Sequence, residues 1–171
     1  MTDQSLAERS GTFRLGGDLP VYRLGFGAMR ITGAGIWGEP EDADEAKRVL
    51  RRALELGINF IDTADSYGPD VSERLIGETL HPYPAGLVIA TKGGLTRSGP
   101  NQRTRNGRPE YLRNALETSR RPLIHEILDL YQLHRNDNKV PAVASQGALA
   151  KQREEGKIRH IGLSEVTPEQ L

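Results

Sequence analysis

The chain has 171 residues, in which 23 lysines and arginines balance 23 aspartates and glutamates, and it contains no cysteine. A formal charge of zero gives no electrostatic basis for binding nucleic acid or an anionic membrane, and the lack of cysteine excludes disulfides and thiolate zinc sites. A small-molecule partner is therefore expected.

The N-terminal residues 1–11 are polar and contain no apolar signal core. No stretch of the sequence approaches the roughly 18 apolar residues of a membrane span. These features predict a disordered N-terminal segment and a cytoplasmic location.

Short apolar runs alternate along the chain with longer amphipathic segments, a pattern typical of parallel strands joined by helices. A hairpin of 12–15 and 20–23 is expected to precede a first strand at 24–29. Further strands are predicted at 58–61, 87–91, 127–133 and 159–163, and helices at 42–56, 71–80, 109–120 and within 141–155. The segment 96–109 is interpreted as a solvated, mobile loop, and 167–169 as a helix start.

Four polar residues, Asp62, Tyr67, Lys92 and His134, lie at or just after the ends of predicted strands. Because the carboxyl ends of parallel strands open on one face, this placement predicts a single active site. A lysine ammonium lowers the pKa of a neighbouring phenol, a carboxylate orients that ammonium, and an imidazole, neutral or charged, hydrogen-bonds a substrate oxygen. These four side chains together are suited to protonate a carbonyl oxygen while hydride is delivered to the carbonyl carbon. Because no side chain donates hydride, a nicotinamide or flavin is required.

Each of these residues also has an ordinary structural explanation as a cap, a rim aromatic, a solvated charge or a strand-end histidine. Their combination favours the catalytic interpretation. An alternative metal site of Asp62, Asp65 and His134 would leave Lys92 beside a divalent cation and without a role, so no metal is expected.

The sequence resembles the aldo-keto reductase family in six segments that occur in the family's order: 24–30, 59–68, 72–77, 90–94, 129–135 and 156–164. The resemblance implies a (β/α)8 TIM barrel and a NAD(P)H-dependent oxidoreductase that reduces aldehydes or ketones to alcohols. It implies NADPH, or sometimes NADH, as the cofactor, and a catalytic tetrad in which Tyr67 is the proton donor, formed by Asp62, Tyr67, Lys92 and His134. The loops 35–40 and 65–69 resemble a bacterial subgroup that includes pyridoxal reductases, which implies a small aromatic aldehyde as substrate.

The resemblance also implies residues that approach the nicotinamide end of the cofactor: Gly27, Ala28, Met29, Asp62 and Ser164. Glu165 stands where the family commonly has an asparagine, and a carboxylate accepts a hydrogen bond from an amide but cannot donate to its carbonyl. Arg121-Pro122-Leu123 also departs from the expected turn, and Pro122 is predicted to end a helix early.

Two further features carry open alternatives. Trp37 forms an apolar wall for the substrate or packs as a loop aromatic on the hairpin. The arginines of the segment 96–109 meet a phosphate of substrate or cofactor, or are solvated in a mobile loop, which is the favoured interpretation.

A complete barrel of this type typically needs about 250 residues, whereas this sequence accounts for about five β/α units. Residues 12–171 are therefore expected to form an incomplete barrel whose first and last strands are open edges. Two functions follow: a carbonyl reductase, acting alone or as part of something larger, or a catalytically inactive module that self-associates through its strand edges.

Overall fold

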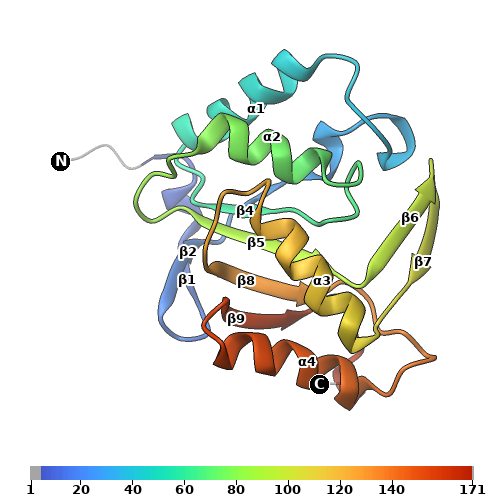
Figure 1. Ribbon diagram of the computed structural model, residues 1–171. Helices are drawn as coiled ribbons and strands as arrows, with labels where there is room; N and C mark the ends of the chain where they lie inside the picture. Colours follow the sequence, from blue (N-terminus) through green and yellow to red (C-terminus); the bar gives the residue numbers. More distant parts are fainter. Residues whose placement is uncertain (1–4, 171) are drawn as a thin grey trace.

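A parallel sheet of five strands forms the centre of the structure, a computed structural model that describes residues 5–170. The strands lie side by side in the order β3 (Phe26–Gly27), β4 (Phe60–Asp62), β5 (Val88–Gly93), β8 (Leu128–Leu133) and β9 (Ile158–Leu163). The helices that follow the first four of these strands are α1 (Ala43–Glu55), α2 (Val71–Leu80), α3 (Pro109–Arg120) and α4 (Ala142–Glu154). This alternation, seen in Figure 1, is that of consecutive β/α units in a TIM barrel.

The helix ends follow local signals in the sequence. At the start of α1 the side chain of Asp42 accepts a hydrogen bond from the backbone amide of Glu45 at 2.8 Å, as an N-cap residue does. Helix α3 begins at Pro109 and ends at Arg120, before Pro122, as predicted. The first strand is shorter than predicted, because only Phe26 and Gly27 have pairing partners on β4, and the chain then turns into a 3-10 helix at Ala28–Ile31.

The N-terminal hairpin of β1 (Thr12–Leu15) and β2 (Leu19–Tyr22) covers the amino ends of the strands, at the left in Figure 1. Leu19 and Val21 pack on Val88. The side chain of Asn59 accepts from the amide of Tyr22 at 2.8 Å, which ties the hairpin to the start of β4. The hairpin therefore closes the end of the sheet opposite the strand ends that carry the predicted site.

Part of the N-terminal segment for which disorder was expected is folded. Residues 1–4 lie outside the described residues, but Ala7 is buried and its amide donates to the carbonyl of Leu56 at 3.1 Å. Ser5 and Glu8 cap each other reciprocally, each side chain accepting from the other's amide at 3.3 Å. This capping box is the signal that favours order at this point.

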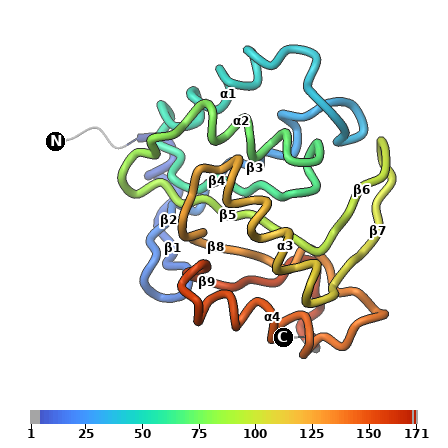
Figure 2. Tube along the Cα trace, viewed as in Figure 1, coloured from blue at the N-terminus to red at the C-terminus, as the bar shows by residue number. Residues whose placement is uncertain are grey.

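The segment 96–109 was also interpreted wrongly as a mobile loop, because much of it belongs to a β-hairpin. Strands β6 (Leu95–Gly99) and β7 (Gln102–Arg105) pair in antiparallel fashion beyond the end of β5, as the Cα trace in Figure 2 also shows. The turn between them places Asn101 at φ 57°, a left-handed conformation that asparagine tolerates well. Leu95 is buried and anchors the base of the hairpin.

Among residues 5–170 the outer strands β3 and β9 each pair with a single neighbour, so the sheet has two open edges in this part of the chain, as predicted. Leu24, beside β3, and Ile127, beside β8, are about half exposed. In the part of the chain that the structure describes, no helix is both long enough and apolar enough to span a membrane.

Candidate active site

The four predicted catalytic residues meet at the carboxyl ends of the strands. Asp62 is the last residue of β4, Lys92 lies near the end of β5, His134 follows β8, and Tyr67 is in the loop between β4 and α2. Lys92 Nζ lies 2.5 Å from Asp62 Oδ2 and 5.3 Å from the centroid of the Tyr67 ring. The rings of Tyr67 and His134 meet edge to face, with their centroids 5.7 Å apart.

Strand register explains why the acid and base meet. Asp62 is the register partner of Ala90, two residues before Lys92, and Lys92 is the partner of Gln132 on β8. Side chains two residues apart share one face of a sheet, so Asp62, Lys92 and Gln132 point to the same side. The amide of Gln132 donates to Asp62 Oδ1 at 3.1 Å, and Lys92 also donates to the carbonyl of Thr63 at 2.9 Å.

Gln132 was not singled out from the sequence, although a signal for it exists. It lies two residues before His134 in a predicted strand and breaks an otherwise apolar alternation. A polar side chain at that position faces the same side as the predicted site.

The loop that carries Tyr67 is fixed by hydrogen bonds to neighbouring elements. The hydroxyls of Thr63 and Ser72 lie 2.8 Å apart, and Ser72 also donates to the carbonyl of Ala28 at 3.0 Å. Gly68 has φ 99°, and a Cβ there would lie 2.4 Å from that of Val71, so glycine is required. These contacts fix the conformation of the loop that carries Tyr67.

His134 is buried and is held by Ser66, a second residue that the sequence analysis did not identify. The hydroxyl of Ser66 lies 3.3 Å from His134 Nδ1. Burial, followed by the charge of Lys92 and nearby arginines, lowers the pKa of His134 from 6.5 to about 3. The imidazole is therefore neutral at physiological pH, which decides between the two protonation states left open by the sequence.

The expected lowering of the Tyr67 pKa is wrong for this structure. Burial, with a further contribution from the charge of Asp62, raises the pKa of Tyr67 from 10 to about 12. The ammonium of Lys92 lies over the phenol ring and is directed to Asp62 and Thr63, so its charge is already compensated. Desolvation of the phenolate is then the dominant effect.

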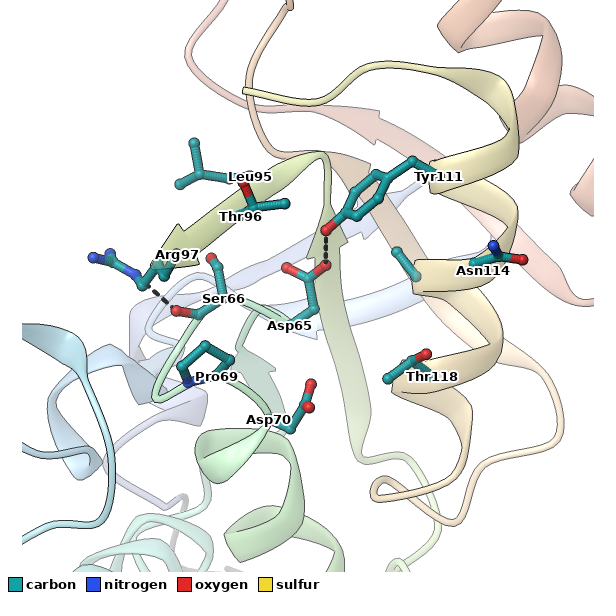
Figure 3. A pocket seen from close by; sticks show the side chains of 11 residues that line it. Asp65, Ser66, Pro69, Asp70, Leu95, Thr96, Arg97, Tyr111, Asn114 and Thr118 are labelled. Carbon is teal, nitrogen blue, oxygen red and sulfur yellow. Dashed lines mark hydrogen bonds between the residues drawn. The ribbon is translucent and has the colours of Figure 1, made fainter. Parts of the chain in front are cut away.

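The β6–β7 hairpin reaches the site through Arg97, which donates from Nε to the carbonyl of Ser66 at 2.7 Å. Figure 3 shows this contact beside a cavity of about 290 Å³ between the hairpin, the loop after β4 and α3. Tyr111 donates from this cavity's wall to Asp65 at 3.4 Å, and burial raises the pKa of the Asp65 carboxyl well above its usual value.

The alternative metal site is not supported by this geometry. Asp65 bonds Tyr111 of α3, whereas Asp62 bonds Lys92 and Gln132 on the strands. Among residues 5–170 no group of three or more histidine, aspartate or glutamate side chains is placed to hold a metal ion.

The residues expected near the cofactor lie in different environments. Gly27 pairs with Asp62 in register, is exposed, and has open space where a Cβ would stand. Met29 is half-buried, whereas Ala28 is fully buried and its carbonyl accepts from the hydroxyl of Ser72, so Ala28 has no exposed atom for a ligand.

At the far edge, Ser164 follows β9 and its amide donates to the carbonyl of Leu133 at 3.0 Å. Glu165, at φ 51°, accepts from Arg135 at 2.5 Å. Trp37 is half-buried and forms an isolated parallel bridge with Gly68, beside Tyr67. Its backbone thus joins the loop after β3 to the loop of the candidate site.

A half-barrel of parallel β/α units with Asp, Tyr, Lys and His side chains gathered at its strand ends defines a TIM-barrel oxidoreductase class. The profile of the aldo/keto reductase family matches residues 23–171, and the chain belongs to this family. The family uses nicotinamide cofactors and acts on small-molecule carbonyl substrates.

Three relatives illustrate the similarity. An uncharacterised oxidoreductase of Schizosaccharomyces pombe is 53% identical over 165 residues, covering 96% of this chain and 53% of the relative. Pyridoxine 4-dehydrogenase of Escherichia coli is 42% identical over 168 residues, covering 95% of this chain and 58% of the relative. The structure of a glycerol dehydrogenase from Gluconobacter oxydans superposes with a TM-score of 0.84 at 40% identity, covering 94% of this chain and 50% of that one. The chain thus spans about half the length of the relatives it matches.

Proposed function

We propose that this chain carries the proton-donating site of a NAD(P)H-dependent carbonyl reductase, with NADPH the expected cofactor and Tyr67 the acid. The observation that supports this most directly is the continuous contact from Asp62 through Lys92 to Tyr67 and His134. Three of the four side chains are buried, whereas Asp62 is about one-third exposed, at 34%. The arrangement is therefore open on the side of Asp62.

The residues around that opening fit a nicotinamide. Exposed Gly27 leaves space next to Asp62, and a residue without a side chain allows a planar ring to approach the strand end closely. The carboxamide oxygen of Gln132 and the hydroxyl of Ser164 are chemically suited to a ligand amide. Glu165 is engaged by Arg135, so Ser164 is the better candidate for that contact. When bound, the reduced nicotinamide supplies hydride to the carbonyl carbon.

The proton comes from this chain's own residues. Tyr67 keeps its proton at neutral pH because its pKa is raised to about 12, and the alkoxide produced by carbonyl reduction is a much stronger base than phenolate. The ammonium of Lys92 lies over the phenol ring, 5.3 Å from its centroid, and Arg97 is the cation whose charge favours the phenolate. Asp62 holds that ammonium in position.

His134 orients the substrate oxygen. If the hydroxyl of Ser66 donates to Nδ1, then the hydrogen of the neutral ring is on Nε2 and is available to the carbonyl oxygen. A neutral donor polarises the carbonyl without competing with Tyr67 as the acid. Trp37, joined by backbone to Gly68, is proposed as a wall for a small aromatic aldehyde.

A comparison of Tyr67→Phe with Tyr22→Phe tests this proposal. NADPH is titrated into each purified chain by nicotinamide fluorescence, and an aromatic aldehyde is added to follow cofactor oxidation. Tyr67→Phe is expected to lower turnover at least about a hundredfold while cofactor affinity is kept. Tyr22 lies on the N-terminal hairpin and its hydroxyl bonds Glu8, so Tyr22→Phe is a matched control that should retain turnover. Equal turnover in both variants would contradict the assignment of Tyr67.

The open edges of β3 and β9 favour a second candidate, an inactive module that self-associates through these strands. It predicts oligomers in size-exclusion chromatography, binding of a dye for exposed apolar surface, and no NADPH binding. A compact monomer that ignores the dye would argue against it.

A further inference from the structure

Two arginines face each other across the β6–β7 hairpin. Arg97 and Arg103 are register partners, and like charges directly opposite each other on an antiparallel pair are destabilising. Neither has an acidic partner within 4 Å among the residues that the structure describes. The juxtaposition leaves a concentrated positive charge at the tip of an element that reaches the catalytic site.

Arg97 is fixed in a way that leaves its charged end available. Its Nε donates to the carbonyl of Ser66 at 2.7 Å, and the side chain is half-buried. In Figure 3 the terminal nitrogens point away from Asp65 and Tyr111, and they have no hydrogen-bond partner within residues 5–170. A guanidinium held by one nitrogen presents the other two as a preorganised fork for a carboxylate or phosphate.

This charge is close to the reacting groups. Ser66, whose carbonyl holds Arg97, also contacts His134 through its hydroxyl and directly precedes Tyr67. Both Arg97 and Arg103 are among the cations that lower the pKa of His134. An anion bound by the two arginines would therefore sit within electrostatic range of the tetrad.

Other arginines in this part of the chain are engaged by neighbouring residues. Arg135 is paired with Glu165 at 2.5 Å, Arg105 donates to the carbonyl of Asn136 at 3.1 Å, and Arg108 lies 3.6 Å from Glu110. Arg97 and Arg103 are register partners that have no acidic partner within 4 Å among residues 5–170, which makes these two the candidate ligand-binding pair.

We propose that Arg97 and Arg103 form an anion-binding site that selects carbonyl substrates carrying a carboxylate or phosphate group. This inference rests on the proposed function, since it assigns a substrate class to the same site. A phosphate of the cofactor has the same chemistry, and the experiment must distinguish the two sources.

The test compares 4-carboxybenzaldehyde with 4-methylbenzaldehyde, which are similar in size and differ in charge. Values of kcat/KM are measured at saturating NADPH for the unmodified chain, Arg97→Gln, Arg103→Gln and the control Arg108→Gln. The charged aldehyde should be preferred about tenfold, and each of the first two variants should remove most of that preference. The control Arg108→Gln changes an exposed arginine of the same segment and should leave the ratio of kcat/KM for the two aldehydes unchanged.

Direct binding keeps this test independent of turnover. Benzoate and benzamide are titrated calorimetrically into the same four proteins. Benzoate binding that is lost in Arg103→Gln supports the anion site even if neither aldehyde is reduced. The missing reduction would then count against the proposed function and not against the anion site. If the ratio of kcat/KM for the charged and uncharged aldehydes is near one and benzoate does not bind, the inference is overturned. A loss of NADPH affinity in Arg97→Gln and Arg103→Gln with an unchanged aldehyde ratio would assign the arginines to the cofactor and also overturn it.

Discussion

Lys92 and Asp62 form an ion pair whose two members differ in their access to water. The N–O distance is 2.5 Å, and the side chain of Lys92 is 7% exposed whereas that of Asp62 is 34% exposed. Water can hydrate Asp62 if its partner is removed, but it cannot easily reach Lys92. Removing Asp62 and removing Lys92 are therefore expected to lower the free energy of unfolding by different amounts.

Asp62→Asn is expected to destabilise the fold more than Lys92→Met. The first variant leaves a buried ammonium without a negatively charged partner, at a cost of about 2–4 kcal/mol, and the second leaves a partly hydrated carboxylate, at about 1–2 kcal/mol. Urea unfolding of both variants and of the double variant measures these costs. The reverse order of stabilities would contradict the burial argument.

Glu73 provides a pH-dependent prediction that is independent of catalysis. It is fully buried on α2, it accepts from the hydroxyl of Thr91, and burial raises the pKa of its carboxyl from 4.5 to about 7. A carboxyl whose pKa is raised on folding contributes stability below its unfolded value, and this contribution is lost as pH rises from about 4.5 through 7. Glu73→Gln removes this loss, because an amide has no charge to desolvate.

The expected result is that Glu73→Gln is more stable than the unmodified chain by about 3 kcal/mol at pH 8 and by less than about 1 kcal/mol at pH 5. Denaturant midpoints across this range measure the difference. The matched control is Glu126→Gln, at an exposed carboxylate with no ion pair among the described residues, which measures the effect of the same substitution at the surface. A constant difference between pH 5 and pH 8 would show that Glu73 does not titrate in this range.

The sequence predicts where Asp62, Lys92 and His134 lie because their positions depend on where strands end. Apolar runs locate the strands, and the shared direction of parallel strands brings their ends together, so Asp62, Lys92 and His134 follow from periodicity alone. Gln132 and Ser66 are different, because which polar side chains bond Asp62 and His134 depends on register and loop conformation.

Long-range packing explains the other departures. The rise in the Tyr67 pKa depends on burial by the surrounding loops, and the sequence shows only that a lysine is available. The β6–β7 hairpin has few apolar residues, so periodicity indicated a loop, although Pro100-Asn101 is a recognisable turn sequence. In both cases the missing information is which residues pack against one another and so shield polar groups from water.

Two glycines in helix interiors provide the last prediction, since only one has a packing role. A Cβ on Gly77 of α2 would lie within van der Waals overlap of the carbonyl oxygen of Pro122, whereas a Cβ on Gly147 of α4 would meet nothing within 4 Å. Pro122, which follows the end of α3, therefore requires glycine on the facing helix.

Gly77→Ala is expected to destabilise the fold by about 2–3 kcal/mol, because backbone must move to relieve the overlap. Gly147→Ala should stabilise it by about 0.5–1 kcal/mol through helix propensity and reduced entropy of the unfolded chain. Thermal unfolding of the two variants under one condition measures both effects. Equal shifts of the same sign would mean that α2 and the segment at Pro122 do not approach each other as closely as this packing requires.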